Sequence, residues 1–197
     1  MRKLVVATTN QGKAREVAQL LEGLPYEIVS LAGYPDAPDV DETGSTFVEN
    51  AVQKATAYAR FTGELTIADD SGLEVDALDG APGVFSSRFA PTDPERNAKL
   101  LDLIKDVPDQ NRTARFRCAV AVAEPDGGVQ TCEGAVEGRI AREPKGANGF
   151  GYDPIFYVPE LAKHMAELEA SEKNAVSHRG SALRTARKLL TGETKGQ

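Results

Sequence analysis

The chain has 197 residues, of which 41% are hydrophobic and 27% are charged, a composition typical of a folded globular protein and not of a disordered chain. The 23 basic and 30 acidic residues give a net charge of −7, which argues against a broad nucleic-acid-binding surface because such a surface has a basic face. The two histidines and two cysteines form no cluster along the chain, which argues against a structural zinc site.

The hydrophobic runs and the N-terminal segment bear on localisation. Uninterrupted apolar runs are only a few residues long, too short to span a bilayer. The first apolar residues meet polar Thr8 too early to form the hydrophobic region of a signal peptide. We therefore expect a soluble, cytoplasmic protein with no membrane or nucleic-acid partner, in which Cys118 and Cys132 are reduced core residues.

The first third of the chain alternates predicted strands and helices, with strands over residues 3–7, 26–30 and 65–68. Apolar residues at helical spacing predict a helix between the first two strands. Thr46 and Glu49 fit a capping box, in which each side chain satisfies a backbone donor of the first turn, and an apolar stripe of helical period follows them.

The rest of the chain predicts longer strands and further helices. Asp93, followed by proline, marks a helix start, and the apolar spacing predicts further helices over residues 161–168 and 182–190. Strand-like stretches over residues 115–123 and 129–142 are separated by turn residues, which indicates antiparallel hairpins and not further β-α-β units.

Together these elements predict an α/β or α+β domain built on a mixed sheet. The short strands of the first third and the longer hairpin strands of the middle suggest two lobes with a cleft. We expect residues 1–191 to form one bilobed domain, followed by a frayed C-terminal tail over residues 192–197.

The segment between the first predicted strand and the first helix can bind an anion, because backbone N–H groups at a helix start are unpaired and the helix dipole favours negative charge there. It is not a P-loop, since Ala7 and Ala14 stand where that motif requires glycine and Ser or Thr. A plain polar loop that caps the helix is the alternative. The segment consists of Thr8, Thr9, Asn10, Gln11, Gly12 and Lys13.

Asp69 and Asp70 are adjacent carboxylates at the end of a predicted apolar strand, a placement that is unfavourable unless a cation or hydrogen-bond donors compensate them. Strand alternation places the two side chains on opposite faces, so we expect one of them to enter the cleft. Mg²⁺ suits carboxylates in a phosphate site, and Glu42 is a candidate second acid. A solvated turn is the alternative.

Two later segments add ligand-binding chemistry. In Gly149-Phe150-Gly151-Tyr152-Asp153-Pro154 the glycines allow close backbone approach and an aromatic ring can stack on a planar base; a tight turn with core aromatics is the alternative. Lys173 with Ser177-His178-Arg179-Gly180 gathers potential donors, although these residues also fit a solvated, charged helix start. With the anion loop and the carboxylates, these are the parts of a magnesium-dependent nucleotide enzyme.

These motifs, in this order, resemble the inosine triphosphate pyrophosphatase family, and its bacterial dITP/XTP pyrophosphatases in particular. The resemblance runs from about residue 3 to about residue 190. It is also carried by Glu42-Thr43-Gly44 and by Gly80-Ala81-Pro82-Gly83. The chain departs slightly from the family pattern at Thr9, where many members have glycine.

The resemblance implies an elongated α/β fold with a mixed central β-sheet flanked by helices, and two lobes with the active site in the cleft between them. It implies a homodimer that uses Mg²⁺ to hydrolyse non-canonical purine nucleoside triphosphates (dITP, ITP and XTP). The products would be the monophosphate and pyrophosphate, and the reaction would prevent incorporation of these nucleotides into DNA and RNA.

The same resemblance implies the role of each site residue. Asp70 would be the catalytic proton acceptor and a metal ligand, Glu42 the second metal ligand, and Lys54 a counter-charge to this acidic cluster. Phe150 would stack on the base, while Lys173, His178 and Arg179 would meet its 6-oxo group. Substrate would be bound by Thr8, Thr9, Asn10, Gln11, Gly12, Lys13, Ser71, Phe150, Gly151, Tyr152, Asp153, Lys173, His178 and Arg179.

Two other functions stay open on the sequence. The first is a pyrophosphatase for pyrimidine or other modified nucleotides, against which the motif at residues 177–180 argues. The second is a non-catalytic nucleotide-binding module, against which the presence of both Asp70 and Glu42 argues, because a pure sensor needs no metal-bearing base.

Overall fold

The structure is a computed structural model that describes residues 1–193; the last four residues of the predicted frayed tail, 194–197, lie outside the described part. The seven strands of the described chain form one sheet in the order β2-β1-β3-β4-β5-β6-β7. The chain divides into two compact units. Among the described residues, unit 1 comprises Met1–Asp70, Cys118–Gly134 and residues 179–193, and unit 2 comprises Ser71–Arg117 and Ala135–His178.

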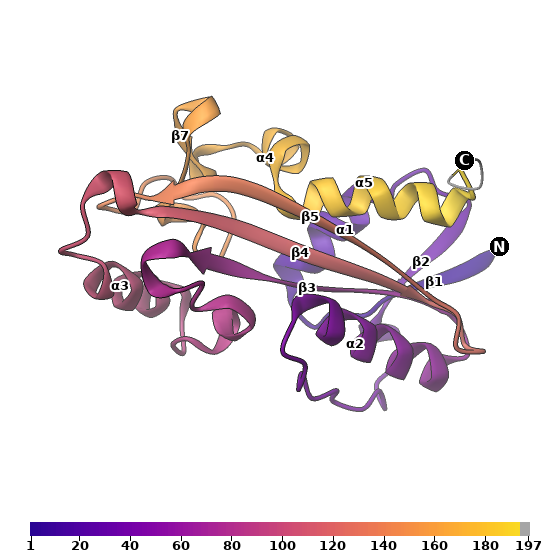
Figure 1. Cartoon of the computed structure of the whole chain (residues 1–197). Helices are drawn as coiled ribbons and strands as arrows, with labels where there is room; N and C mark the ends of the chain where they lie inside the picture. Colours follow the sequence, from indigo (N-terminus) through magenta and orange to yellow (C-terminus); the bar gives the residue numbers. More distant parts are fainter. Residues whose placement is uncertain (194–197) are drawn as a thin grey trace. The chain divides into compact units, whose positions relative to one another are not determined.

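Unit 1 contains parallel strands with helices on both faces. Its elements are β1 (Arg2–Val6), α1 (Gln11–Leu20), β2 (Tyr26–Ser30), α2 (Phe47–Thr62), the first part of β3 (Leu65–Val75), parts of β4 (Thr113–Ala123) and β5 (Val129–Ile140), and nearly all of α5 (His178–Thr191). β1 pairs in parallel with β2 and with β3. Helices α1 and α5 lie over one face of these strands and α2 lies over the other (Figure 1). The predicted alternation of strand and helix in this region is confirmed.

The start of α2 follows the predicted capping box. The hydroxyl of Thr46 accepts from the backbone N–H of Glu49, and the Glu49 side chain accepts in return from the N-cap backbone. The helix ends at Gly63, whose φ of 70° is in the left-handed region that glycine adopts without strain. These two ends fix the register of the helix that carries Asn50 and Lys54.

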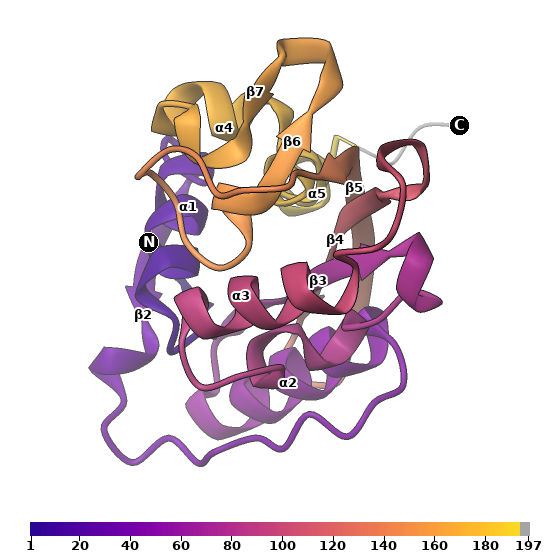
Figure 2. The ribbon, with the colours of Figure 1, turned by 90° about the vertical axis from the view of Figure 1, so that its left-hand side faces the viewer.

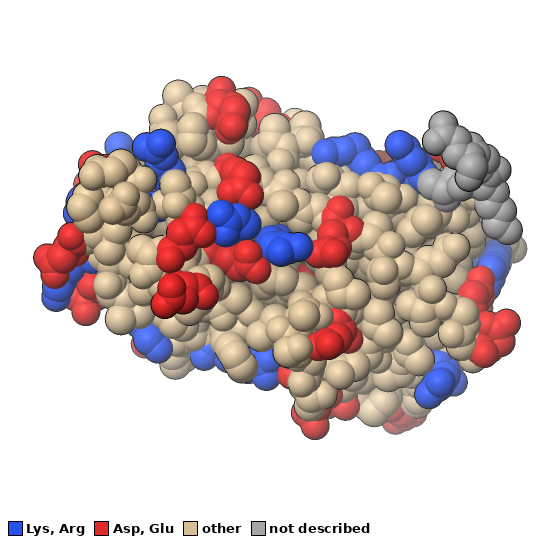
Figure 3. Space-filling model, viewed as in Figure 1, with Lys and Arg blue, Asp and Glu red and all other residues tan. Residues whose placement is uncertain are grey.

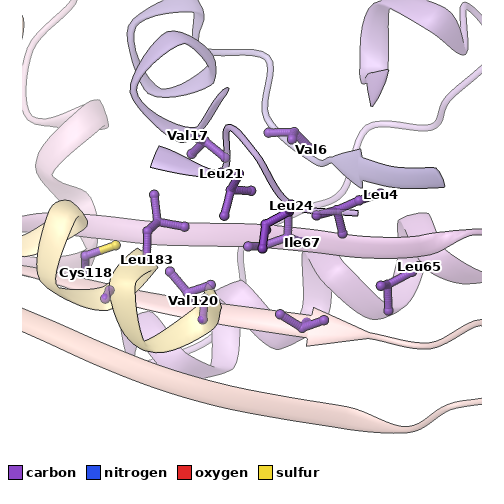
Figure 4. Packing of buried hydrophobic residues seen from close by; sticks show 13 residues of the cluster. Leu4, Val6, Val17, Leu21, Leu24, Leu65, Ile67, Cys118, Val120 and Leu183 are labelled. Carbon is purple, nitrogen blue, oxygen red and sulfur yellow. The ribbon is translucent and has the colours of Figure 1, made fainter. Parts of the chain in front are cut away.

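The apolar core of unit 1 lies on the α1 and α5 side of the strands. Figure 4 shows Val17 from α1, Leu21 directly after it, Ile67 from β3 and Leu183 from α5 among the packed side chains. Leu21 and Leu183 are completely buried, and truncating such a leucine to alanine costs about 2–5 kcal/mol of stability. This core fixes the position of α1, and with it the polar loop that precedes α1.

β3 is longer than predicted, and this changes the setting of the two aspartates. The predicted strand ends at residue 68, whereas β3 continues to Val75, so Asp69 and Asp70 lie inside a strand and not in a turn after it. Their exposed fractions are 4% and 5%. The prediction ended the strand at the first acid because a buried carboxylate is costly; the strand continues because each carboxylate has charged or polar partners.

Unit 2 combines the second half of β3 with hairpin strands and helices. Its other elements are α3 (Asp93–Leu103), the first part of β4, the second half of β5, β6 (Phe156–Val158), β7 (Lys163–His164) and α4 (Ala170–Val176). β5 pairs antiparallel with β6, and β6 with β7. The strands predicted over residues 115–123 and 129–142 correspond to β4 and β5, which are neighbours in the sheet, whereas β6 and β7 were not predicted. Helix α3 lies below these strands and α4 above them (Figures 1 and 2). A separate buried apolar cluster includes Leu73, Leu100, Phe116, Tyr152 and Phe156.

The helix predicted over residues 161–168 is wrong. The chain instead forms the short strand β7 between two single 3₁₀ turns. Ala162 takes a left-handed conformation with a φ of 51° and ends the first turn. Met165 and Leu168 are buried in the unit 2 core, so their helix-like spacing reflects two separate contacts. The helix α4, which the sequence analysis did not predict, follows this region.

Both cysteines are free, as predicted. Cys118 is buried and Cys132 is partly buried, with its thiol 3.3 Å from the carbonyl oxygen of Ala182. Burial raises the pKa of the Cys118 thiol well above its ordinary value, with a smaller contribution in the same direction from Asp69, and burial raises the pKa of Cys132 to about 11. Both thiols are therefore packing residues with little thiolate at neutral pH.

The surface carries mixed charge. On the face drawn in Figure 3, described Lys and Arg side chains are interspersed with Asp and Glu, and a group of basic side chains lies over α5. Within residues 1–193, every helix is too short or too polar to serve as a membrane span.

Candidate active site

The loop between β1 and α1 is ordered by its own side chains. Asn10 is the N-cap of α1, and its Oδ1 accepts from the backbone N–H of Lys13 at 3.0 Å. The Thr8 hydroxyl accepts from the backbone N–H of Asn10 at 3.2 Å. Thr9, Asn10 and Gln11 are exposed. The loop therefore presents polar groups and a helix N-terminus to solvent, the setting in which proteins bind anions.

Asp70 faces α2, where it lies next to the other acid of the predicted metal site. Nδ2 of Asn50 donates to Oδ2 of Asp70 at 3.0 Å. The ammonium of Lys54 lies 3.8 Å from Oδ1 of Asp70 and forms an ion pair with Glu42. Lys54 thus lies beside both predicted metal ligands, which is the position that its predicted role as a counter-charge requires.

Asn50 is a residue of this site that the sequence analysis did not select. It is fully buried, and its Oδ1 accepts from the backbone N–H of Gly44 at 2.8 Å. A Cβ added at Gly44 would lie 2.7 Å from that oxygen, so the close approach requires glycine. The four-residue spacing of Asn50 and Lys54, which places both on one face of α2, was the signal available in the sequence.

The charges of this cluster tune its acid–base properties. Burial raises the pKa of Asp70 above its ordinary value, although the nearby Lys54 and Lys13 oppose the shift. Burial alone would lower the pKa of Lys54, but Asp69, Asp70 and Glu42 outweigh it and raise the pKa. A carboxylate with a raised pKa beside a firmly charged ammonium fits a proton acceptor working near neutral pH.

Asp69 faces the opposite side of β3, as strand alternation predicts. Its Oδ2 is 3.2 Å from Nζ of Lys13 and 3.3 Å from both Nε and Nη2 of Arg179. The Cys118 thiol donates to the same oxygen at 3.9 Å, and Nη1 of Arg179 donates to Glu16 at 2.5 Å. Burial would raise the pKa of Asp69, but Lys13 and Arg179 together hold it well below its ordinary range.

In unit 2, Asp153 and Lys173 form a buried ion pair at 2.6 Å, with side chains 4% and 5% exposed. Asp153 also accepts from the backbone N–H of Phe150 at 2.9 Å, and the Lys173 ammonium lies 4.6 Å from the centre of the Phe150 ring. Gly149 has a φ of 78°, and a Cβ there would collide with the Asp153 carboxylate. The glycine-aromatic turn is therefore organised around this ion pair.

Helix α3 anchors the same turn through two residues that the sequence analysis did not select. The backbone N–H of Gly151 donates to Asp93 at 2.7 Å, and its carbonyl accepts from Nδ2 of Asn97 at 3.1 Å. These partners are more than fifty residues away along the chain, so no local pattern identifies them.

Two predicted substrate-binding side chains are packed inside unit 2. The ring of Tyr152 belongs to the apolar cluster, and its hydroxyl donates to the carbonyl of Ser86 at 2.9 Å. His178 is 5% exposed as a residue, and its ring stacks on the ring of Phe116, with the ring centres 4.8 Å apart. For Tyr152 this matches the alternative of a tight turn with a core aromatic. Ser71, next to Asp70 in β3, is partly buried.

The carboxylates of Asp70 and Glu42 are the candidate ligands for a metal ion. Among the described residues, no group of three or more His, Cys, Asp or Glu side chains has metal-binding geometry. Mg²⁺, however, keeps several waters and binds proteins through one or two carboxylates. The pair formed by Asp70 and Glu42, which share Lys54 as a counter-ion, fits that requirement.

The chain matches known proteins over nearly its whole length. Residues 4–189 match the Ham1 family. A protein of Desulforamulus reducens named dITP/XTP pyrophosphatase is 56% identical over 191 residues, 95% of each chain. A protein of the same name from Geobacter sulfurreducens is 52% identical over 93% of this chain and 94% of its own.

Solved structures agree with this match. A HAM1 protein from Coxiella burnetii is 47% identical, with a TM-score of 0.89 over 98% of this chain and 100% of its own. A nucleoside-triphosphatase / dITP/XTP pyrophosphatase from Mycobacterium abscessus is 44% identical, with a TM-score of 0.76 over 93% and 98% of the two chains. The predicted mixed-sheet α/β fold and the resemblance are confirmed, and the chain belongs to the Ham1 family.

Proposed function

We propose that the protein is a dITP/XTP pyrophosphatase that hydrolyses non-canonical purine nucleoside triphosphates (dITP, ITP and XTP) to the monophosphate and pyrophosphate. The observation that carries the proposal is the buried Asp70, held by Asn50 and placed beside Lys54 and Glu42. Relatives that are 56% and 52% identical to this chain bear that enzyme name.

In this proposal Asp70 accepts the proton of the attacking water. Its raised pKa makes it a stronger base than an exposed aspartate, and the amide of Asn50 fixes its orientation. General-base help of this kind contributes about 10²–10⁴-fold to rate. Asp70 and Glu42 would hold Mg²⁺, which supplies Lewis-acid neutralisation of the phosphate charge when bound.

The triphosphate is assigned to the loop before α1. Thr8, Thr9, Asn10, Gln11, Gly12 and Lys13 combine hydroxyls, amides, a helix N-terminus and an ammonium. Such a group binds phosphates by backbone N–H donation and by charge. Ser71 directly follows Asp70, the proposed general base, in β3, and is proposed to contact the substrate.

The purine base of the substrate is assigned to the turn around Phe150. We propose that the ring of Phe150 stacks on the purine and that Gly151, Tyr152 and Asp153 shape the pocket. Lys173, His178 and Arg179 are proposed as donors toward a 6-oxo group. Adenine presents an amino group at that position, and a buried donor left unpaired costs about 1–3 kcal/mol.

The wider assignments follow from the family resemblance. We propose Mg²⁺ as the metal, a homodimer as the assembly and the cytoplasm as the location, with neither nucleic acid nor membrane as a partner. The cellular role would be to keep deaminated purine nucleotides out of DNA and RNA. Sedimentation of the purified protein, expected to give twice the chain mass, tests the assembly directly.

Hydrolysis of a panel of triphosphates with Mg²⁺ tests the function. We expect monophosphate and pyrophosphate from dITP, ITP and XTP, and much slower release from ATP, whose 6-amino group would face the proposed donors. Strong preference for UTP or dTTP would instead support the pyrimidine alternative. Measurable binding of ITP without release of pyrophosphate would support a non-catalytic module.

A further inference from the structure

Asp69, the neighbour of the proposed general base Asp70, has no role in the proposed chemistry but is the centre of a largely buried ion network. The network consists of Glu16, Arg179, Asp69 and Lys13, and we call it the Asp69 network. Side chains of Asp69 and Arg179 are 3% and 2% exposed, whereas that of Lys13 is 17% exposed. The network thus runs from the interior of unit 1 to the surface, and Lys13 is its outer end.

Three groups converge on a single oxygen of Asp69. The Lys13 ammonium lies 3.2 Å from Oδ2, the Arg179 guanidinium 3.3 Å from it, and the Cys118 thiol 3.9 Å from it. A carboxylate so enclosed is poorly placed to bind a metal or to accept a proton from water. Asp69 is therefore unsuited to the chemistry proposed for Asp70, although the two are adjacent in β3.

The network is also a weak way to stabilise the fold. The carboxylates of Asp69 and Glu16 balance the charges of Lys13 and Arg179. Desolvation offsets most of this attraction, and apolar residues of similar volume often stabilise a fold equally well. What the arrangement does supply is position: Asp69 comes from a central strand and fixes the end of a flexible side chain that starts in the loop before α1. An ammonium has three donors, so one carboxylate contact leaves others for phosphate oxygens.

We propose that Asp69 is a positioning residue that holds the Lys13 ammonium ready for the triphosphate before substrate binds. The inference rests on the proposed role of the loop before α1 in phosphate binding. A lysine ordered in advance loses less side-chain freedom on binding, which corresponds to an affinity gain of about tenfold at most for a single long side chain. Asp69 accordingly acts on substrate affinity and leaves the chemical step to Asp70.

A double-mutant cycle with Asp69→Asn and Lys13→Met tests this inference. Two quantities are measured with Mg²⁺ present: KM and kcat for dITP, and the Kd for inorganic pyrophosphate by calorimetry. Asp69→Asn is expected to raise KM and Kd by about five- to tenfold, with kcat within about threefold of wild type. In the Lys13→Met background the same change is expected to alter the Kd for pyrophosphate by less than about twofold, because pyrophosphate lacks the nucleobase that Arg179 is proposed to contact.

Three results would overturn the inference. The first is an Asp69→Asn variant with unchanged KM and Kd. The second is an equal effect of Asp69→Asn in both backgrounds, which would mean that it acts by a route other than Lys13. The third is a large fall in kcat at constant KM, which would give Asp69 a chemical role. If wild type released no pyrophosphate from any purine triphosphate, the proposed function would fail, while the Kd cycle would still test the link between Asp69 and Lys13.

Two further variants separate positioning from folding. Glu16→Gln removes the carboxylate on the far side of Arg179 and leaves the Asp69–Lys13 contact, so it is expected to lower the unfolding temperature with KM and Kd within about twofold of wild type. A rise in KM as large as that of Asp69→Asn would contradict a specific action on Lys13.

Asp69→Glu keeps the buried charge should Asp69→Asn fail to fold. A cavity of about 10 Å³, bordered by Asp69, Ala7 and Thr8, gives some room for the extra methylene. This variant is expected to fold and to keep KM within about threefold of wild type. A folded Asp69→Glu protein with the KM of Lys13→Met would overturn the inference.

Discussion

Replacing Asn50 by aspartate is the most informative change at the proposed base, because it exchanges a hydrogen-bond donor for a like charge. Nδ2 of Asn50 lies 3.0 Å from Oδ2 of Asp70. Two unit charges at that distance repel by about 5 kcal/mol at an effective dielectric constant of about 20. The Lys54 ammonium, 3.8 Å from Oδ1 of Asp70, offsets part of this, so the two carboxylates are expected to share a proton near neutral pH.

The assay is kcat/KM for dITP as a function of pH, with saturating Mg²⁺. Activity requires the deprotonated base, so it falls as the pH drops through the pKa of Asp70. Asn50→Asp raises that pKa, and the acid limb should therefore move upward by at least about one pH unit, with about tenfold less activity per unit below it. Gln53→Glu is the matched control, because Gln53 is on the same helix and bonds to Thr43 instead of Asp70. Superimposable profiles for Asn50→Asp and wild type would refute the reasoning.

Three further outcomes follow from the site and the cysteines. Phe150→Ala should raise KM for dITP about fivefold or more through lost stacking, and an unchanged KM would count against its placement at the base. Asp153→Asn leaves Lys173 buried without its counter-charge and should lower the free energy of unfolding by about 3–5 kcal/mol in a denaturant titration; a loss under about 1 kcal/mol would contradict this. Cys118 and Cys132, with raised pKa values, should react with a thiol reagent far more slowly in native than in unfolded protein, and equal rates would show that the packing is wrong.

Elements fixed by neighbouring residues were predictable from the sequence. The strand over 26–30 matches β2, and the capping box at Thr46 and Glu49 is present as expected, because each depends on residues a few positions apart. The helix expected over 161–168 failed because its spacing arises from contacts with the unit 2 core and not from one continuous face. Periodicity alone does not distinguish the two cases.

The setting of the paired aspartates was less predictable, since it depends on distant partners. The sequence assigned opposite faces to Asp69 and Asp70 but ended the strand before them. Asp69 is compensated by Arg179, 110 residues away along the chain, and Asp70 by a helix twenty residues before it. A buried charge is tolerated only where such partners lie next to it in the fold, and no local sequence pattern identifies partners so distant along the chain.

The most direct test of the account is the turnover of dITP by Asp70→Asn with Mg²⁺ present. The amide keeps the size of the side chain but cannot accept the proton of the attacking water. We expect less than about a tenth of the wild-type kcat, with an unfolding transition that stays cooperative. A well-folded Asp70→Asn protein that retains more than about a tenth of the wild-type rate would contradict the assignment of Asp70 as the base.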